Sequence, residues 1–188
     1  MADNGFSVPA PDFSKVEFWD PTKGGVNDPE PGAYAGMVVA AGEHLGATSG
    51  KKSARITVAL DGGPETDLYL GLDFSKPSNK QKFATALASC GVTVAKIPPN
   101  TNITPAFFMG KDGKGARCYV IVKLVDGVNA KGQKNLNDKE FATKEQYEAY
   151  KAIPAASRPV STPSAPAGGS APAAPPAGPA DLNGLFGG

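Results

Sequence analysis

The alternation of apolar and polar residues predicts three strands in the first half of the chain. Every second residue of segment 53–60 is apolar, as in a strand that buries one face. The turn residues 61–63 (Asp-Gly-Gly) join it to a second alternating segment, 66–72, as in a β-hairpin. A run of small apolar residues over 33–41, opened by Pro31 and Gly32, predicts another strand ahead of this pair.

A helix is predicted to follow these strands. Ser78, with Gln81 three residues later, forms a capping-box pattern that places the helix start at Ser78. Gly91 stands where the C′ residue is expected, because glycine readily adopts the left-handed conformation that ends many helices. The apolar residues between these two ends recur at helical spacing: Phe83, Ala86, Leu87 and Cys90.

The strand pattern returns in the second half of the chain. Segment 117–125 alternates strongly up to the turn 126–127, and a weaker extended segment covers 132–141. A second capping box, Thr143 with Gln146, begins a short closing helix. Three strands, a helix and two further strands follow the order of the OB fold. The sequence therefore predicts a mainly β protein with a five-stranded OB-like antiparallel barrel, a helix between strands 3 and 4, and a short C-terminal helix.

Composition divides the chain into three regions. Residues 1–31 combine acids, proline and glycine with several aromatic residues, and we expect part of this leader to pack on the domain. Residues 32–153 carry the periodic patterns and form the predicted binding domain. Residues 154–188 consist almost entirely of Pro, Ala, Gly and Ser, which bury too little apolar surface to offset the entropy of ordering. We therefore expect a disordered tail.

The formal net charge of +1 conceals an uneven distribution. Residues 1–50 hold seven acids against Lys15 and Lys23, a net charge of −5, whereas residues 51–151 hold sixteen Lys and Arg against ten acids, a net charge of +6. The middle of the chain is therefore mildly basic behind an acidic leader. This asymmetry permits phosphate binding without demonstrating it.

Residues that carry enzyme chemistry are scarce. His44 is the only histidine, and a lone histidine in a glycine-rich loop is usually a solvated residue. Cys90 and Cys118 stand in apolar patterns, which indicates buried, reduced thiols. The chain lacks a CxxC pair, a GxGxxG sequence and a P-loop sequence. We therefore expect no enzymatic activity, no metal and no cofactor.

Outward-facing strand residues are the stronger candidates for function. In segment 117–125, the residues between the core positions share an outer face with Arg55 and Tyr69, because strand side chains alternate. Cations follow a phosphate backbone and flat rings stack on bases of any identity, so such a face suits single-stranded DNA. Two loops add further candidates: Lys51 and Lys52 in one, and Phe107 and Phe108 near Lys111 in the other. The predicted DNA-binding residues are Lys51, Lys52, Arg55, Tyr69, Phe107, Phe108, Lys111, Arg117, Tyr119 and Lys123.

Each of these residues has a plain structural alternative. Charges and tyrosines on an outward strand face are often only solvated surface. Phe107 and Phe108 are alternatively core residues, and Lys51 and Lys52 an ordinary exposed turn. The prediction therefore depends on their joint placement on one face.

Three segments resemble phage-encoded single-stranded DNA-binding proteins of the OB-fold type. They are PGAYAGMVVAAGEHLGATSGKKSARITVAL (31–60), FFMGKDGKGARCYVIVKLV (107–125) and NLNDKEFATKEQYEAY (135–150). The resemblance covers roughly residues 30–151, about two thirds of the chain. It implies binding to displaced or replicating single strands, with roles in DNA replication and recombination.

The end of the tail adds a second point of resemblance. Single-strand binders of bacteria and phages often end in a flexible linker with a short tip that docks partner proteins. Here the apolar residues of the tip are Leu182, Leu185 and Phe186, and they imply docking of replication or recombination proteins. The family's tip is typically rich in acids, whereas this tip holds only Asp181. A chance apolar cluster at a disordered end is the alternative.

Two other functions remain open at this stage. One is a structural or adaptor role in a virion or its assembly, with a protein-binding β-domain, and the other is an RNA-binding OB protein. The chain shows no signal-peptide pattern and no apolar stretch of membrane-spanning length. We therefore expect a cytoplasmic protein without membrane contact, in the host cytoplasm if it is phage-encoded.

Overall fold

The computed structural model describes residues 6–14, 16–18, 31–46, 50–124 and 137–154. It contains seven strands, two α-helices and two 3₁₀-helices within this part of the chain. In chain order they are β1 Val8–Pro9, β2 Gly32–Leu45, β3 Lys52–Leu60, β4 Glu65–Gly71, α1 Pro77–Ser89, η2 Val94–Lys96, β5 Asn102–Ile103, η3 Pro105–Phe108, β6 Arg117–Leu124, β7 Asn137–Ala142 and α2 Lys144–Ala152.

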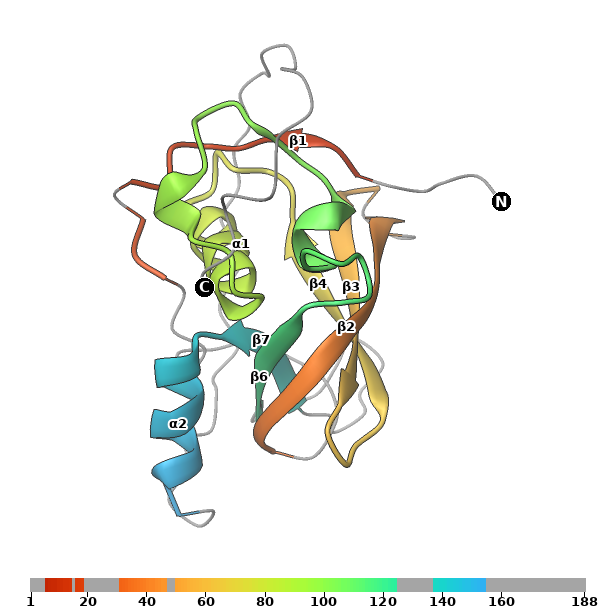
Figure 1. Cartoon of the computed structure of the whole chain (residues 1–188), viewed down its shortest axis with the longest axis vertical. Coiled ribbons are helices and arrows are strands. Elements are labelled where there is room, and N and C mark those ends of the chain that lie inside the picture. The colour runs from red at the N-terminus through yellow and green to blue at the C-terminus, as the bar shows by residue number, and fades with distance from the viewer. Residues whose placement is uncertain (1–5, 15, 19–30, 47–49, 125–136, 155–188) are drawn as a thin grey trace.

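Five strands form one antiparallel sheet in the order β4-β3-β2-β6-β7, and β1 pairs with β5 in a separate two-stranded sheet. Along the chain, α1 lies between β4 and β6, which are the third and fourth strands of this sheet in sequence order, and α2 follows β7 (Figure 1). The prediction of a mainly β protein with five antiparallel strands and two helices is confirmed. The first five positions of the weak segment 132–141, and the predicted tail from residue 155 onward, lie outside the described residues.

A closed barrel is not found in the described part of the chain. The edge strands β4 and β7 share no ladder of backbone hydrogen bonds there. They do meet through side chains, because Lys139 Nζ of β7 donates a hydrogen bond to Thr66 Oγ1 of β4 at 2.6 Å.

The N-cap of the first helix lies two residues earlier than the capping-box pattern of Ser78 and Gln81 predicts. Its N-cap is Lys76, which makes no side-chain cap, and Pro77 occupies the first turn. Proline is suited to this position because its fixed φ is already helical and its missing N–H needs no partner there. Ser78 therefore lies inside the helix, and the predicted capping box with Gln81 is wrong.

The other predicted helix ends are confirmed. Gly91 has φ of +81°, and the Gly91 and Val92 N–H groups donate to the Ala88 and Leu87 carbonyls in the Schellman pattern. The second capping box is also present: Gln146 N–H donates to Thr143 Oγ1 at 3.3 Å, and Thr143 N–H donates to the Gln146 side chain at 2.8 Å.

The leader contributes to the core. Phe6, Ala10 and Phe13 are buried with the core residues of the sheet, which confirms that part of the leader packs on the domain. Phe6 meets Phe83 of α1 and Phe108 of η3 edge-on, with ring centroids 6.3 and 6.1 Å apart. In Figure 1, β1 runs above α1. Residues before β2 therefore hold α1 and η3 together.

The helix α2 covers the outward side of β6. Ile121, Ala142 and Tyr150 are buried against one another, and the Tyr119 ring lies 4.8 Å from the Tyr147 ring of α2 between centroids. The predicted exposed face over β6 is therefore mostly covered, because α2 buries its apolar side there. Among the predicted outward residues of β6, Arg117 remains exposed.

Candidate functional site

The exposed face of the sheet lies on β2, β3 and β4. Register sets Gly42, Arg55 and Tyr69 side by side on three neighbouring strands, and Ala40, Thr57 and Asp67 form the next row. Their side chains point away from the core because Ala54, Ile56 and Val58 occupy the alternate, buried positions of β3. We call this surface the outward face. It consists of Ala40, Gly42, His44, Ser53, Arg55, Thr57, Asp67 and Tyr69.

Two rings meet at one end of the outward face. Tyr69 is 52% exposed, and its ring centroid lies 4.9 Å from that of His44, with the planes inclined by 59°. His44 is not among the predicted site residues, because the sequence pattern places it in a glycine-rich loop after a strand over 33–41. The structure has a β-bulge between Val38 and Ala40, which reverses the alternation of the residues that follow. His44 therefore joins the outward face.

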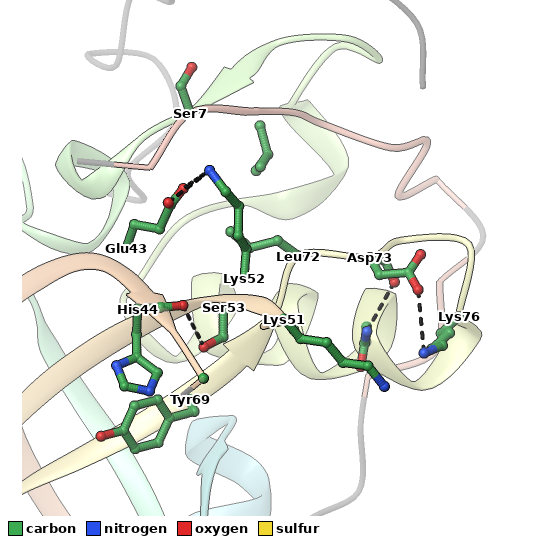
Figure 2. Close-up of a pocket in the computed structure, with 14 residues that line it drawn as sticks. Ser7, Glu43, His44, Lys51, Lys52, Ser53, Tyr69, Leu72, Asp73 and Lys76 are labelled. Atoms are coloured by element: carbon green, nitrogen blue, oxygen red, sulfur yellow. Dashed lines mark hydrogen bonds and ion pairs between the residues drawn. The ribbon is translucent and has the colours of Figure 1, made fainter. Parts of the chain in front are cut away.

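The ring pair borders a groove of about 780 Å³ (Figure 2). One wall comes from the leader residues Ser7 and Val8, and the floor includes Gly71. A Cβ at Gly71 would lie 2.6 Å from the Asn79 side chain, so only glycine leaves this floor undisturbed. Three lysines line the groove from different sides: Lys51, Lys52 and Lys76.

Two of the three groove lysines form ion pairs with nearby acids. Lys52 Nζ lies 2.8 Å from Glu43 Oε1, and Lys76 Nζ lies 3.4 Å from Asp73 Oδ2. Figure 2 shows the Lys52 side chain pointing toward Glu43, with Ser7 on the opposite side of the groove from Tyr69. The groove is therefore lined by side chains of both charges, with the exposed Tyr69 ring and the half-buried His44 ring at its edge.

Arg55 is held along the middle of the outward face by Asp67. Its guanidinium lies 2.8 Å from Asp67 Oδ2, and Thr57 Oγ1 donates to Asp67 Oδ1 at 2.7 Å. Burial alone would raise the pKa of Asp67, but the hydrogen bonds from Arg55 and Thr57 lower it below its usual value. The hydrogen bond to Asp67 raises the pKa of Arg55. Both side chains are therefore charged at neutral pH.

A second hollow of about 520 Å³ lies at the start of β6. Lys111, Arg117 and Lys144 line it together with Tyr119, so three separate elements supply its cations. Arg117 is 53% exposed and forms a two-point ion pair with Asp61, one contact of which is 2.9 Å from Nη1 to Oδ1. We call this the β6 hollow.

The loop before β6, which lines part of the β6 hollow, packs closely against β2. Gly115 has φ of +116°, and an added Cβ would collide with the Val38 carbonyl oxygen. Only glycine allows this loop to approach β2 so closely.

Seven of the ten predicted site residues line these surfaces. Lys51, Lys52 and Tyr69 line the groove, Arg55 lies beside them on the outward face, and the β6 hollow is bordered by Lys111, Arg117 and Tyr119. The partner-docking residues Leu182, Leu185 and Phe186 lie outside the described residues.

The other three predicted residues are buried, so their expected exposure is wrong. Phe107 and Phe108 belong to η3 and fill the core, where Phe108 packs against Phe83 with ring centroids 5.7 Å apart. Lys123 is 0% exposed, with Nζ 3.8 Å from Asp138 and 3.7 Å from Glu140. Strand β7 supplies both acids, and a charge removed from water requires such partners.

Comparisons with known proteins do not assign the chain to a family. No family model matches the chain, and no curated protein matches it.

Among the described residues, no three His, Cys, Asp or Glu side chains gather as a metal site would require. Cys90 and Cys118 are free and buried, and the pKa of Cys90 is raised well above its usual value by the hydrogen bond with Cys118 and by burial. In the same part of the chain, neither helix has the length and apolar character to cross a bilayer.

Proposed function

We propose that this protein binds single-stranded DNA without sequence preference, with the groove beside His44 and Tyr69 as its main contact. The observation that carries this proposal is the exposed Tyr69 ring, paired with the half-buried His44 ring at the edge of a lysine-lined groove. Stacking on an aromatic ring tolerates every base, and lysines contact phosphates at any sequence.

The strand order supports an OB-type binding mode. We infer an OB-type sheet from the order β4-β3-β2-β6-β7, with α1 between the third and fourth strands. In OB folds, the second and third strands and the loop between the first two carry oligonucleotides. Here those strands are β3 and β4, which supply Arg55 and Tyr69, and the loop ends at Lys51.

The ion pairs of the groove and the outward face determine how strongly DNA affinity is expected to depend on salt concentration. Arg55, Lys52 and Lys76 each have an acidic partner, so the surface is less positive than its lysines and arginine alone imply. If about three phosphates contact the face, the logarithm of affinity falls with the logarithm of salt at a slope of about −2. A much steeper slope is expected only of an unpaired basic surface.

The test is fluorescence anisotropy of labelled oligo-dT, oligo-rU and a matched duplex, with wild type, Tyr69→Ala, Tyr69→Phe and Lys96→Ala. Losing one stacking partner costs about 1–3 kcal/mol, so Tyr69→Ala is expected to weaken oligo-dT binding about 5- to 150-fold. Tyr69→Phe keeps the ring and retains most affinity. Lys96 is exposed and lines neither hollow, so its replacement controls for a surface substitution outside the groove.

Each outcome of this test separates the proposed function from its alternatives. Preference for oligo-rU over oligo-dT assigns the face to RNA. Absence of binding to all three probes at low salt refutes the proposal and favours a protein-binding role. Exposed Met37, Val39 and Leu45 on β2 are the apolar residues that such a protein partner would contact.

A further inference from the structure

The outward face continues beyond Arg55 to the β6 hollow. Met37 pairs with Ala59 of β3 on one side and with Arg117 of β6 on the other. The row Ala59-Met37-Arg117 therefore lies on the same side of the sheet as Arg55 and Tyr69. Six residues along β3 separate Ser53, at the groove, from Ala59, which corresponds to about 20 Å at the rise of an antiparallel strand.

The surface between the two ends is shallow and exposed. Ala40 and Gly42 contribute little side-chain volume, while Val39 and Met37 are 42% and 43% exposed. Arg55 stands between the two ends with 51% of its side chain exposed. A chain lying along this path passes from the ring pair, over Arg55 and Met37, to Arg117.

The β6 hollow has the chemistry of a second phosphate contact. Lys111 and Lys144 are both exposed, and they reach the hollow from the loop before β6 and from the first turn of α2. Arg117 adds a planar guanidinium that suits phosphate oxygens. Its present partner is the Asp61 carboxylate, an anion of similar geometry.

We propose that the β6 hollow is a second phosphate anchor for the same DNA strand, so that one strand spans both hollows along the outward face. This inference rests on the proposed function and defines the extent of its site. At about 3.4 Å per stacked nucleotide, 20 Å corresponds to about six nucleotides, and fewer when the strand is extended. This length lies within the range of about 4–16 nucleotides per OB fold.

A length series of oligo-dT separates the two anchors. The double variant Lys111→Ala/Lys144→Ala removes cations from the β6 hollow, and Lys51→Ala/Lys76→Ala removes two from the groove. With oligo-dT of about 12 nucleotides, each double variant is expected to bind about tenfold more weakly than wild type. With about 3 nucleotides, which cannot span both hollows, only the groove variant loses affinity. Lys96→Ala controls for net charge, and circular dichroism checks that each variant is folded.

The outcomes distinguish this inference from the proposed function. If wild type binds but the β6-hollow variant matches it on long oligonucleotides, the second anchor is refuted and the proposed function stands. Equal loss on short and long oligonucleotides also refutes the anchor, since it indicates a general charge effect. If wild type binds no oligonucleotide at low salt, both proposals fail.

Discussion

Replacing Asp138 by asparagine tests the buried charge cluster of β6 and β7. The Asp138 side chain is only 6% exposed, and it lies near Lys123 of β6 and Glu140 of its own strand. Lys82 of α1 forms an ion pair with Glu140 on the same cluster. Burial, followed by the charge of Glu140, raises the pKa of Asp138 to about 7, against the opposing effect of Lys123 and Lys82.

The raised pKa fixes the sign of the effect. An aspartate in an unfolded chain titrates at about 3.9, so between about pH 4 and 7 the folded protein keeps a proton that the unfolded chain has lost. The free energy of unfolding therefore falls as pH rises through this window. At 1.36 kcal/mol per pH unit over about three units, Asp138 costs the fold about 4 kcal/mol at most above pH 7.

The asparagine side chain of the variant resembles the protonated carboxyl in shape and stays neutral at every pH. Asp138→Asn is therefore expected to match wild type near pH 4 and to be more stable by about 1–4 kcal/mol at pH 8. Urea unfolding at half-unit pH steps from 4 to 8.5 measures both curves. Glu148→Gln on the exposed side of α2 serves as the matched control, because it removes a carboxylate outside the cluster.

The difference between the two curves isolates Asp138 from the other carboxyls. The lowered pKa of Asp67 makes the free energy of unfolding rise with pH, the opposite of the Asp138 effect. This contribution is the same in wild type and variant, so it cancels in their difference. A variant whose free energy of unfolding runs parallel to wild type between pH 4 and 8 would show that this reasoning is wrong. A variant less stable than wild type at pH 8 would show that Lys123 needs the Asp138 charge.

Two further changes test the site and the leader. Asp61→Asn removes the carboxylate that pairs with Arg117. By anisotropy at fixed salt, oligo-dT of about 12 nucleotides is therefore expected to bind about three- to tenfold more tightly. Unchanged affinity would show that Arg117 does not contact the DNA. Phe6→Ala opens a cavity against Phe83 and Phe108 and is expected to lower the free energy of unfolding by about 3–5 kcal/mol in urea titrations. For the same reason, deletion of the whole leader is expected to destabilise the domain.

The strands with one continuous alternation were predictable from the sequence. In β3 the alternate residues Ala54, Ile56, Val58 and Leu60 are buried. In β4 Leu68 and Leu70 are buried while Tyr69 is exposed. Arg55 and Tyr69 were found in this way. The second half of β2 was not predictable in the same way, because the bulge after Val38 depends on pairing with β3.

The misplaced residues of the site depend on contacts between distant segments. The alternation of β6 correctly places Lys123 on the side of the sheet that faces away from the core. Asp138 and Glu140 of β7 lie on that same side, and the three side chains form a buried cluster. Phe107 and Phe108 pack in the same core as Phe6, about a hundred residues away in sequence, which no local pattern records. Binary patterning gives the face of a strand, whereas only tertiary packing decides whether that face meets solvent.

The two-residue strand β1 forms part of the groove wall, so ligand binding depends on whether β1 is docked. Val8 pairs with Ile103, 95 positions further along the chain, and with Ser7 it forms a wall of the groove. So short a strand opens locally at a lower free energy than the five-stranded sheet. A ligand that contacts this wall binds only while β1 is docked, so its apparent affinity scales with the docked fraction. Ligand binding in turn stabilises the docked state. It therefore protects from hydrogen exchange the Ala10 N–H, which donates to the Thr101 carbonyl.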